Sequence, residues 1–197
     1  MTTPTKRMDR SVQRTRQLLR QASIDVMKEK GFSATSIRDI AERANVNRGT
    51  FYAHFADKYD LLEALLREEV QHLILDGLPP LSRWDKDTLC LLIQTVLEGF
   101  EKLLHACYPS PVRDALLERV IQEELAALLL AWLKQARQGT THRQVSLETT
   151  AQVASWAIFG AAVQWSRGTT TKTSEQTAQD VLLIITEGMA PGMLRAR

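Results

Sequence analysis

One short polar stretch of the chain carries side chains that could bind a nucleic acid. Arg48, Thr50 and Tyr52 can donate hydrogen bonds, and they are interleaved with Phe51 and Phe55, whose rings we expect in a core. A bidentate guanidinium suits guanine, so Arg48 is a candidate reader of a base edge, although it could equally hold a phosphate. Thr50 and Tyr52 could be ordinary helix residues, but hydrogen-bonding groups on the exposed side of such a helix favour contact with DNA.

Three further residues of this stretch are candidates for contact with the DNA backbone. We expect His54 and Lys58 at phosphates, and Lys58 lies near the start of a helix whose free amide groups already favour an anion. Gly49 costs helix stability, so its presence indicates that the backbone comes close to DNA or to a neighbouring helix. These phosphate contacts would hold the protein on DNA without specifying a base sequence.

Two short helices joined by a tight turn must position these side chains. Thr35 or Ser36 can cap the first helix, with Asp39 as a capping-box partner. Asn45 tolerates the left-handed backbone that ends this helix, and Asn47 can cap the second one. Apolar residues at the spacing of one buried face lie along the first helix, namely Ile37, Ile40, Ala41 and Ala44. The pattern is a helix-turn-helix, whose second helix lies in the major groove, and Thr35, Ser36 and Asn47 complete the predicted DNA-binding residues.

This stretch resembles the DNA-binding head of the TetR family of transcriptional regulators. The resemblance covers roughly a quarter of the chain and rests on Thr35, Ile37, Ile40, Ala41, Ala44, Val46, Gly49, Phe51, Tyr52, His54, Phe55, Lys58, Leu61 and Leu62. Many family members have glycine where this chain has Asn45, and asparagine also accepts a positive φ. The resemblance implies that Lys58 contacts a phosphate. It also implies a homodimer built on a four-helix bundle, with two C-terminal helices from each subunit.

The charge of the chain is unevenly distributed. The formal net charge is only +2, but residues 1–58 hold twelve Lys and Arg against six Asp and Glu, whereas residues 59–197 hold thirteen against seventeen. The basic N-terminal part is suited to contact the phosphates of DNA, whereas the mildly acidic remainder should bind a partner other than DNA. We therefore predict a flexible basic arm over 1–10, a helix-turn-helix DNA-binding domain over 11–58, and a helical ligand-binding and dimerisation domain over 59–197.

No segment alternates like a strand, so the predicted fold is all-α. Outside the helix-turn-helix, we expect helices over residues 11–30, 57–75, 85–107, 112–138, 146–167 and 174–189. The last two are the predicted homodimer interface, since Ala157, Gly160 and Ala162 leave room for another helix to approach. They could instead simply complete the core of the monomer.

Aromatic side chains of the second domain could line an apolar cavity, which is the usual composition of a small-molecule site. The candidates are Trp84, Phe100, His105, Tyr108, Trp132, Trp156, Phe159 and Trp165. Of these we predict Phe100, Trp132 and Trp156 as ligand-binding residues, although an aromatic at helical spacing is often part of a core. The apolar bias favours a hydrophobic or amphipathic inducer over a phosphorylated sugar.

The sequence gives little support for a disulfide, a metal site, a catalytic site or a membrane segment. Cys90 and Cys107 form no CxxC pair and the histidines are scattered, so we predict no disulfide, metal or cofactor. Neither a phosphate-binding glycine loop nor the spacing of a catalytic triad occurs, so an enzyme is not predicted. The sequence also shows no signal peptide and no apolar run of the roughly 20 residues that span a membrane, which favours a cytoplasmic protein.

These features together predict a sequence-specific transcriptional regulator that binds double-stranded DNA at a palindromic operator as a homodimer. Repression, relieved by a small apolar or amphipathic ligand, is the simplest mode, because a bound dimer can block polymerase by occupancy alone; activation stays open. The alternative is an architectural or assembly protein that binds DNA at many sites without a small-molecule inducer.

Overall fold

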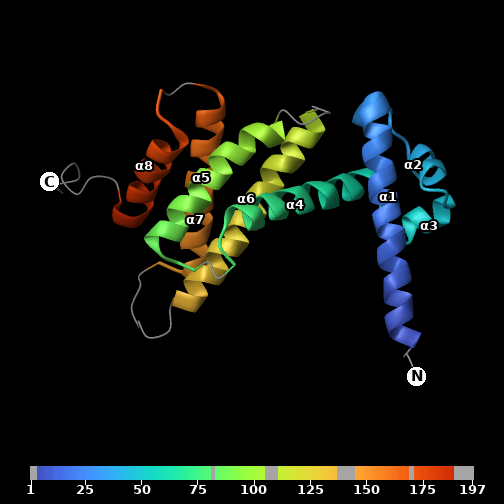
Figure 1. The fold of residues 1–197 in the computed structure, drawn as a ribbon, viewed down its shortest axis with the longest axis horizontal. Coiled ribbons are helices and arrows are strands. Elements are labelled where there is room, and N and C mark those ends of the chain that lie inside the picture. Colours follow the sequence, from blue (N-terminus) through green and yellow to red (C-terminus); the bar gives the residue numbers. More distant parts are fainter. Residues whose placement is uncertain (1–3, 81–82, 105–110, 137–144, 169–170, 189–197) are drawn as a thin grey trace. The chain divides into compact units, whose positions relative to one another are not determined.

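The fold is all-α, as the sequence predicts. The computed structural model describes residues 4–80, 83–104, 111–136, 145–168 and 171–188, and every regular element in these ranges is a helix (Figure 1). The helices are α1 Pro4–Ala34, α2 Ile37–Arg43, α3 Arg48–Tyr52, α4 Lys58–Gly77, α5 Lys86–Leu104, α6 Pro111–Ala136, α7 Leu147–Ser166 and α8 Ser174–Glu187. Each predicted helical segment overlaps one of these helices, and the predicted ends at residues 105–107, 137–138 and 189 lie outside the described ranges.

The bounds of α1 differ most from the prediction. The helix begins at Pro4 rather than Ser11, so residues 4–10 are helical where the sequence predicts a flexible arm. Proline suits a first helical turn, because its φ is already helical and its missing amide proton would have no acceptor there. At the other end, Gly31 has φ 77° and ψ 160°, which breaks the helix at the predicted residue before the chain continues to Ala34.

The chain divides into two compact units. The first comprises Met1–Leu66 with Ala106–Leu116, and the second comprises Arg67–His105 with Leu117–Arg197. Both α4 and α6 therefore contribute residues to each unit. The domain boundary predicted between residues 58 and 59 falls at the start of α4, and it stays a prediction.

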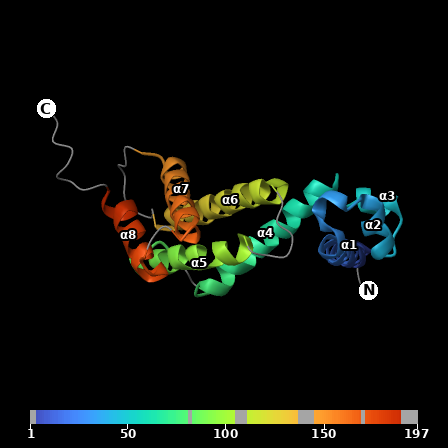
Figure 2. The ribbon, with the colours of Figure 1, turned by 90° about the horizontal axis from the view of Figure 1, so that it is seen from above.

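In the first unit, α2 packs against α1, and α3 packs against α2 (Figure 2). The shared core is apolar and consists of Leu19, Ala22, Ile40, Ala44, Phe51, Phe55 and Leu61. Ile40 and Ala44 confirm the predicted buried face of α2. The Phe51 and Phe55 rings are buried as predicted, with their centroids 5.9 Å apart. The buried rings fix one side of α3 against the core, which leaves its polar side facing solvent.

In the second unit, α5 lies beside both α7 and α8 (Figures 1 and 2). α4 and α5 approach each other closely at two glycines. A Cβ on Gly99 would lie 2.3 Å from Cδ2 of Leu73, and a Cβ on Gly77 would lie 2.3 Å from Cγ2 of Thr95. An alanine at either position would therefore force the helices apart or displace the side chain of Leu73 or Thr95. None of the described helices has the length and the apolar character needed to cross a bilayer.

Candidate nucleic-acid interface

The first helix of the predicted motif starts with a complete capping box. Oγ of Ser36 accepts a hydrogen bond from the Asp39 amide at 3.2 Å, and the Asp39 carboxylate accepts one from the Ser36 amide at 2.8 Å. The Lys30 ammonium also lies 2.5 Å from the Asp39 carboxylate. Hydrogen bonds from Lys30, then from Ser36, hold the pKa of Asp39 well below its usual range. The predicted cap is confirmed, and it ties α2 to the end of α1.

The turn and the second cap also have the predicted geometry. Asn45 has φ 53° and is the one non-glycine residue with positive φ among those described. The Val46 amide donates to the Ala41 carbonyl oxygen at 3.0 Å, which closes the end of α2. Oδ1 of Asn47 then accepts from the Thr50 amide at 2.8 Å and starts α3. The left-handed turn at Asn45 and the cap at Asn47 thus fix where α2 ends and where α3 begins.

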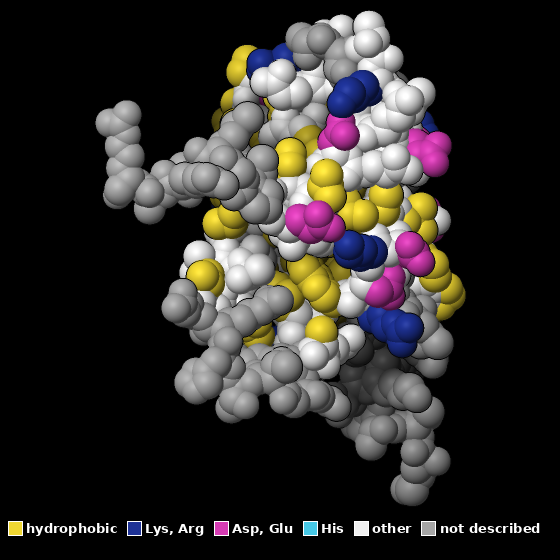
Figure 3. All heavy atoms as spheres, turned by 90° about the vertical axis from the view of Figure 1, so that its left-hand side faces the viewer, with side chains coloured by type: hydrophobic (Ala, Val, Ile, Leu, Met, Phe, Trp, Pro, Cys, Tyr) yellow, Lys and Arg dark blue, Asp and Glu magenta, His cyan; other side chains and the backbone are white. Residues whose placement is uncertain are grey.

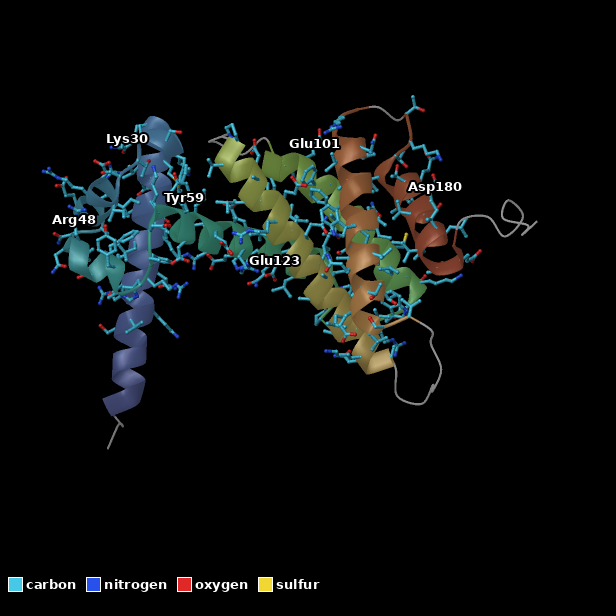
Figure 4. All side chains as sticks on the ribbon, turned by 180° about the vertical axis from the view of Figure 1, so that it is seen from behind. Lys30, Arg48, Tyr59, Glu101, Glu123 and Asp180 are labelled. Atoms are coloured by element: carbon cyan, nitrogen blue, oxygen red, sulfur yellow. The ribbon has the colours of Figure 1, made fainter. Side chains whose placement is uncertain are left out.

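The polar side of α3 faces solvent. Arg48 is exposed and points away from α1 (Figure 4), while the Tyr52 side chain is 51% exposed. Thr50 and His54 are half-buried, and the Thr50 hydroxyl donates to Oδ1 of Asn47 at 3.2 Å. A guanidinium, a phenol, a hydroxyl and an imidazole therefore lie on or beside one short helix, and all of them can bond to base edges or phosphates.

Gly49 has a local role that the sequence does not reveal. A Cβ at this position would lie 3.1 Å from Oδ1 of Asn47, and no other atom outside its own helix backbone and chain neighbours lies within 4 Å. Glycine therefore leaves room for the side chain that caps α3. The close neighbour is this cap rather than the helix suggested by the sequence, while close approach to DNA stays a prediction.

Thr35 departs from its predicted role as a DNA contact. Its side chain is only 2% exposed, and its hydroxyl donates to the Gly31 carbonyl oxygen at 2.8 Å. This bond helps to satisfy the end of α1, where Gly31 breaks the helix and leaves carbonyl groups without helical partners. Ser36, by contrast, is exposed next to it.

Lys58 also has partners within the protein. Its ammonium donates to the carbonyl oxygens of Phe32 at 3.2 Å, Ser33 at 3.3 Å and Thr35 at 2.9 Å, and it lies 4.7 Å from the centre of the Phe32 ring. The predicted phosphate contact would compete with these bonds. The sequence signal for the observed role is Gly31, because a helix that ends there leaves carbonyl oxygens for a nearby cation to bind.

The three predicted ligand-binding aromatics do not share one cavity. Phe100 lines a small cavity of about 10 Å³ in the second unit, between α4, α5 and α6. Trp132 is buried on α6, and Trp156 is 52% exposed on α7. The Phe159 ring links two of them, with its centroid 5.5 Å from that of Phe100 and 6.3 Å from that of Trp156. The cavity lining is wholly apolar and consists of Val70, Leu73, Ile74, Val96, Phe100, Leu103, Ile121 and Leu125.

A second, larger hollow lies in the same unit, where α7 meets the end of α8. It is an open groove of about 440 Å³ that includes Trp84, one of the aromatic candidates. Its other lining residues are apolar side chains and threonines, namely Val145, Thr149, Thr150, Val153, Ala154, Ala157, Ile184, Ile185 and Thr186. The three predicted ligand-binding residues, Phe100, Trp132 and Trp156, are therefore not among the residues that line this groove.

The helices predicted to form the dimer carry exposed apolar side chains. Val153 and Trp156 of α7 are 63% and 52% exposed, and Leu183 and Ile184 of α8 are 53% and 52% exposed. Figure 3 shows the face over α8, where apolar side chains lie between charged ones. A cluster of large apolar side chains on a protein surface often marks a site where a partner binds.

Comparison with known proteins agrees with the helix-turn-helix. A family model for bacterial regulatory proteins of the tetR family matches residues 19–65, which include α2, α3 and parts of α1 and α4. The HTH-type transcriptional repressor BepR of Brucella suis is 26% identical over 78% of this chain and 81% of its own length. The uncharacterized HTH-type transcriptional regulators YxbF and YvdT of Bacillus subtilis are 38% and 31% identical, but the chain spans only 21% and 54% of their lengths.

Solved structures extend the likeness to the remaining helices. FadR of Thermus thermophilus, a TetR-family transcriptional repressor solved in complex with lauroyl-CoA, is 26% identical and superposes with a TM-score of 0.55. The match covers 92% of this chain and 98% of that one. The flavonoid-responsive regulator FrrA shares the fold, with a TM-score of 0.58 at 23% identity over 91% of this chain and 98% of its own. Residues 19–65 thus match the tetR family of bacterial regulatory proteins, and the chain as a whole is similar in fold to a TetR-family transcriptional repressor.

Proposed function

We propose that this protein is a sequence-specific DNA-binding transcriptional regulator, a repressor that leaves a palindromic operator when a small apolar or amphipathic ligand binds. The observation that carries the proposal is the geometry of α3. Arg48 and Tyr52 are exposed while Phe51 is buried, and Asn47 fixes where the helix starts. A helix held in this way can enter the major groove with its first residues at the base edges.

The DNA contacts that we propose follow the exposure of the side chains. Arg48, Thr50 and Tyr52 read bases, while Ser36, His54 and the backbone at Gly49 contact phosphates and position the helix. We leave Thr35 out because it is buried. Lys58 remains a phosphate candidate only if its ammonium can exchange carbonyl oxygens for a phosphate.

A homodimer through α7 and α8 would supply the two-fold symmetry that a palindrome requires. The exposed apolar residues of both helices support this interface, since a second copy would remove them from water. Two recognition helices would then meet half-sites about 34–36 Å apart, one helical turn of DNA. The protein would act in the cytoplasm, where bacterial DNA lies.

Release by a ligand requires that the ligand bind the DNA-incompetent arrangement more tightly. Coupling of about 1–3 kcal/mol would change operator affinity by about 5–150-fold. The lauroyl-CoA bound by Thermus thermophilus FadR supports an amphipathic ligand here, and so does the apolar lining around Phe100. Since α4 contributes residues to both units, a shift of this helix is the proposed route from ligand to DNA.

The decisive experiment selects duplexes from a random DNA library with the purified full chain. It is repeated with a Thr50→Ala, Tyr52→Ala variant and with a control, Lys134→Ala, Gln135→Ala, that alters exposed residues of α6. We expect wild type and control to recover one palindromic motif that the α3 variant loses. Addition of lauroyl-CoA should then lower the affinity for that motif.

The alternative is a protein that binds DNA at many sites for architecture or assembly. It would retain duplexes without a shared motif, would be unaffected by the α3 substitutions, and would not respond to a ligand. This outcome would contradict the proposed role as a sequence-specific regulator, and only electrostatic, sequence-independent DNA binding would remain.

A further inference from the structure

An arginine of α1 lies next to the end of α3. Arg16 is exposed, and its Cζ lies 4.9 Å from the centre of the Phe55 ring. Phe55 follows α3 and is buried in the core that also contains Leu19, one turn after Arg16 on α1. An aromatic ring attracts a cation over its face but does not neutralise it. The guanidinium is therefore held at the surface, beside the end of α3, with its charge intact.

The Arg16 guanidinium differs from other surface arginines of the first unit in its partners. Arg38 and Arg43 are also exposed, and each forms an ion pair with a glutamate at 2.7 Å. Among the described residues, none accepts a hydrogen bond from the Arg16 side chain or forms an ion pair with it. The same holds for Arg48, the proposed base reader. The N–H groups of Arg16 are thus available to an acceptor from outside the protein.

Positive charge accumulates around Arg16. Arg20 lies one turn further along α1 and is half-buried. Burial, and next the charge of Arg16, lower the pKa of Arg20 from its usual value. Two like charges four residues apart destabilise a helix. An anion bound at Arg16 would offset this repulsion.

The position of Arg16 suits the backbone of a DNA duplex. A helix in the major groove lies between two phosphate backbones, because the groove is only about 12 Å wide. Arg48 is the first residue of α3, whereas Arg16 lies beside Phe55, three residues after the end of this helix. Figures 1 and 4 show that the N-terminal part of α1 continues past α3. With the start of α3 at the bases, Arg16 can therefore reach the backbone that flanks the groove.

We propose that Arg16 binds a phosphate of the DNA next to the groove that α3 enters, and that it thereby positions α3. The inference rests on the proposed DNA binding and adds a contact from α1, ahead of the residues 19–65 that match the family model. A guanidinium can bind two phosphate oxygens at once, which fixes orientation as well as adding affinity. Such a contact carries no sequence information, so binding to every duplex should depend on it equally.

The test measures DNA affinity of the full chain by fluorescence anisotropy at several salt concentrations. Wild type is compared with Arg16→Gln, with Arg16→Lys, and with the control Arg14→Gln. Arg14 is an exposed arginine of the same helix, and residues two apart on a helix point to different sides.

We expect Arg16→Gln to weaken binding to the selected motif and to a random duplex alike, and to lower the slope of log affinity against log salt by about 1. The ratio of wild-type to variant affinity should then shrink about 3-fold as the salt concentration rises from about 50 to 200 mM. Arg16→Lys retains a cation and should keep the slope. Arg14→Gln should keep both slope and affinity.

A purely structural role for Arg16 predicts a different result. If the guanidinium only covers Phe55, Arg16→Gln lowers the thermal midpoint and leaves the salt slope unchanged, which overturns the proposal. An equal loss of slope in Arg14→Gln would mean that α1 supplies only diffuse positive charge, which also overturns it. The proposed function fails separately. If wild type recovers no shared motif, the sequence-specific regulator is wrong, while the salt slopes on a random duplex still decide the role of Arg16.

Discussion

The helix-turn-helix and the cavity of the second unit are built from contacts of very different range. In the first, Ser36 bonds to Asp39 and Asn47 bonds to Thr50, each three residues away. In the second, residues from three helices, numbered from 70 to 125, line one small space. The first site is therefore largely fixed by local caps. The second exists only when distant helices have packed, so a substitution far away in the sequence can alter it.

The difference also concerns where the chemistry lies. The polar groups of α3 face solvent and need no change of the protein to meet DNA. The cavity of the second unit is enclosed by apolar side chains and is only about 10 Å³, so a ligand enters it only after the wall has opened. We expect substitutions in α3 to change DNA affinity with little effect on stability, and substitutions around the cavity to change both stability and ligand response.

The largest effect is expected for Arg48→Ala on operator binding. Loss of a bidentate contact to a base costs about 1–3 kcal/mol, so affinity for the selected motif should fall about 5–150-fold and the preference at one base position should relax. Fluorescence anisotropy with the motif and with single-base variants measures both quantities. Lys134→Ala, an exposed cation of α6, is the control and should leave both unchanged.

An Arg48→Ala variant that weakens binding equally for every sequence would show a phosphate contact instead. In that case the base reading would lie with Thr50 and Tyr52 alone.

Lys58→Met should have the next largest effect, and on stability rather than on recognition. The substitution removes an ammonium that donates to the carbonyls of Phe32, Ser33 and Thr35, and hydrogen bonds of charged groups contribute about 1.5–3 kcal/mol. We expect the free energy of unfolding to fall by about 2 kcal/mol, measured by urea denaturation, whereas Lys28→Met on the exposed side of α1 should change it little.

The resemblance to the family assigns Lys58 to a phosphate, and salt dependence tests this role separately. Loss of one phosphate contact lowers the slope of log affinity against log salt by about 1. An unchanged slope together with reduced stability would mean that Lys58 stabilises the DNA-binding domain and does not contact a phosphate. A reduced slope with unchanged stability would instead support the contact with DNA.

Lys58 also shows where sequence reasoning reaches its limit. The caps at Ser36 and Asn47 and the turn at Asn45 could be predicted because each depends on residues within a few positions. The carbonyls that Lys58 binds are 23 to 26 residues away, and only the break at Gly31 hints that they are free. The start of α1 was missed for a related reason, since a polar segment carries no apolar periodicity to mark a helix.

In the second unit, periodicity identified the helices but not which side of each faces which neighbour. Phe100, Trp132 and Trp156 follow similar helical spacing, yet one lines the cavity, one is buried and one is exposed. The side that each of α5, α6 and α7 turns towards its neighbours decides these outcomes, and it depends on contacts between helices that are far apart in the sequence.

Gly99→Ala tests whether the second unit depends on close packing of distant helices. The added Cβ would lie 2.3 Å from Leu73, so α4 and α5 must separate or the leucine must move. Overpacking of this kind costs about 1–3 kcal/mol, which outweighs the better helix propensity of alanine. Thermal denaturation should show a lower midpoint, and ligand binding next to Leu73 should change with it.

Gly160→Ala is the matched control, because a Cβ there would have no described atom within 4 Å apart from its chain neighbours and the backbone of its own helix. Within one subunit it should stabilise α7 by up to about 1 kcal/mol. A loss of stability instead would place another helix against Gly160, as the proposed dimer requires. Equal effects of the two substitutions would contradict the close approach of α4 and α5.

The smallest effect should be the pH dependence of the cap on α2. The Lys30 ammonium and Ser36 lower the pKa of Asp39, so the folded state holds this carboxylate in its charged form more strongly than the unfolded chain does. Its contribution to stability is complete above the unfolded pKa of about 3.9 and is lost as the pH falls through the folded pKa. Because the group is partly exposed, solvent screening keeps this contribution small. Thermal midpoints of wild type and Asp39→Asn, measured from pH 7 to pH 2, should therefore differ by a constant amount down to about pH 4 and draw closer only below it. Asp76→Asn, an exposed carboxylate near the end of α4, provides the comparison.

A difference between wild type and Asp39→Asn that stays constant over this range would mean that the side chain of Asp39 contributes through its hydrogen bonds and not through its charge. The ion pair with Lys30 would then have no measurable part in holding α2 to α1.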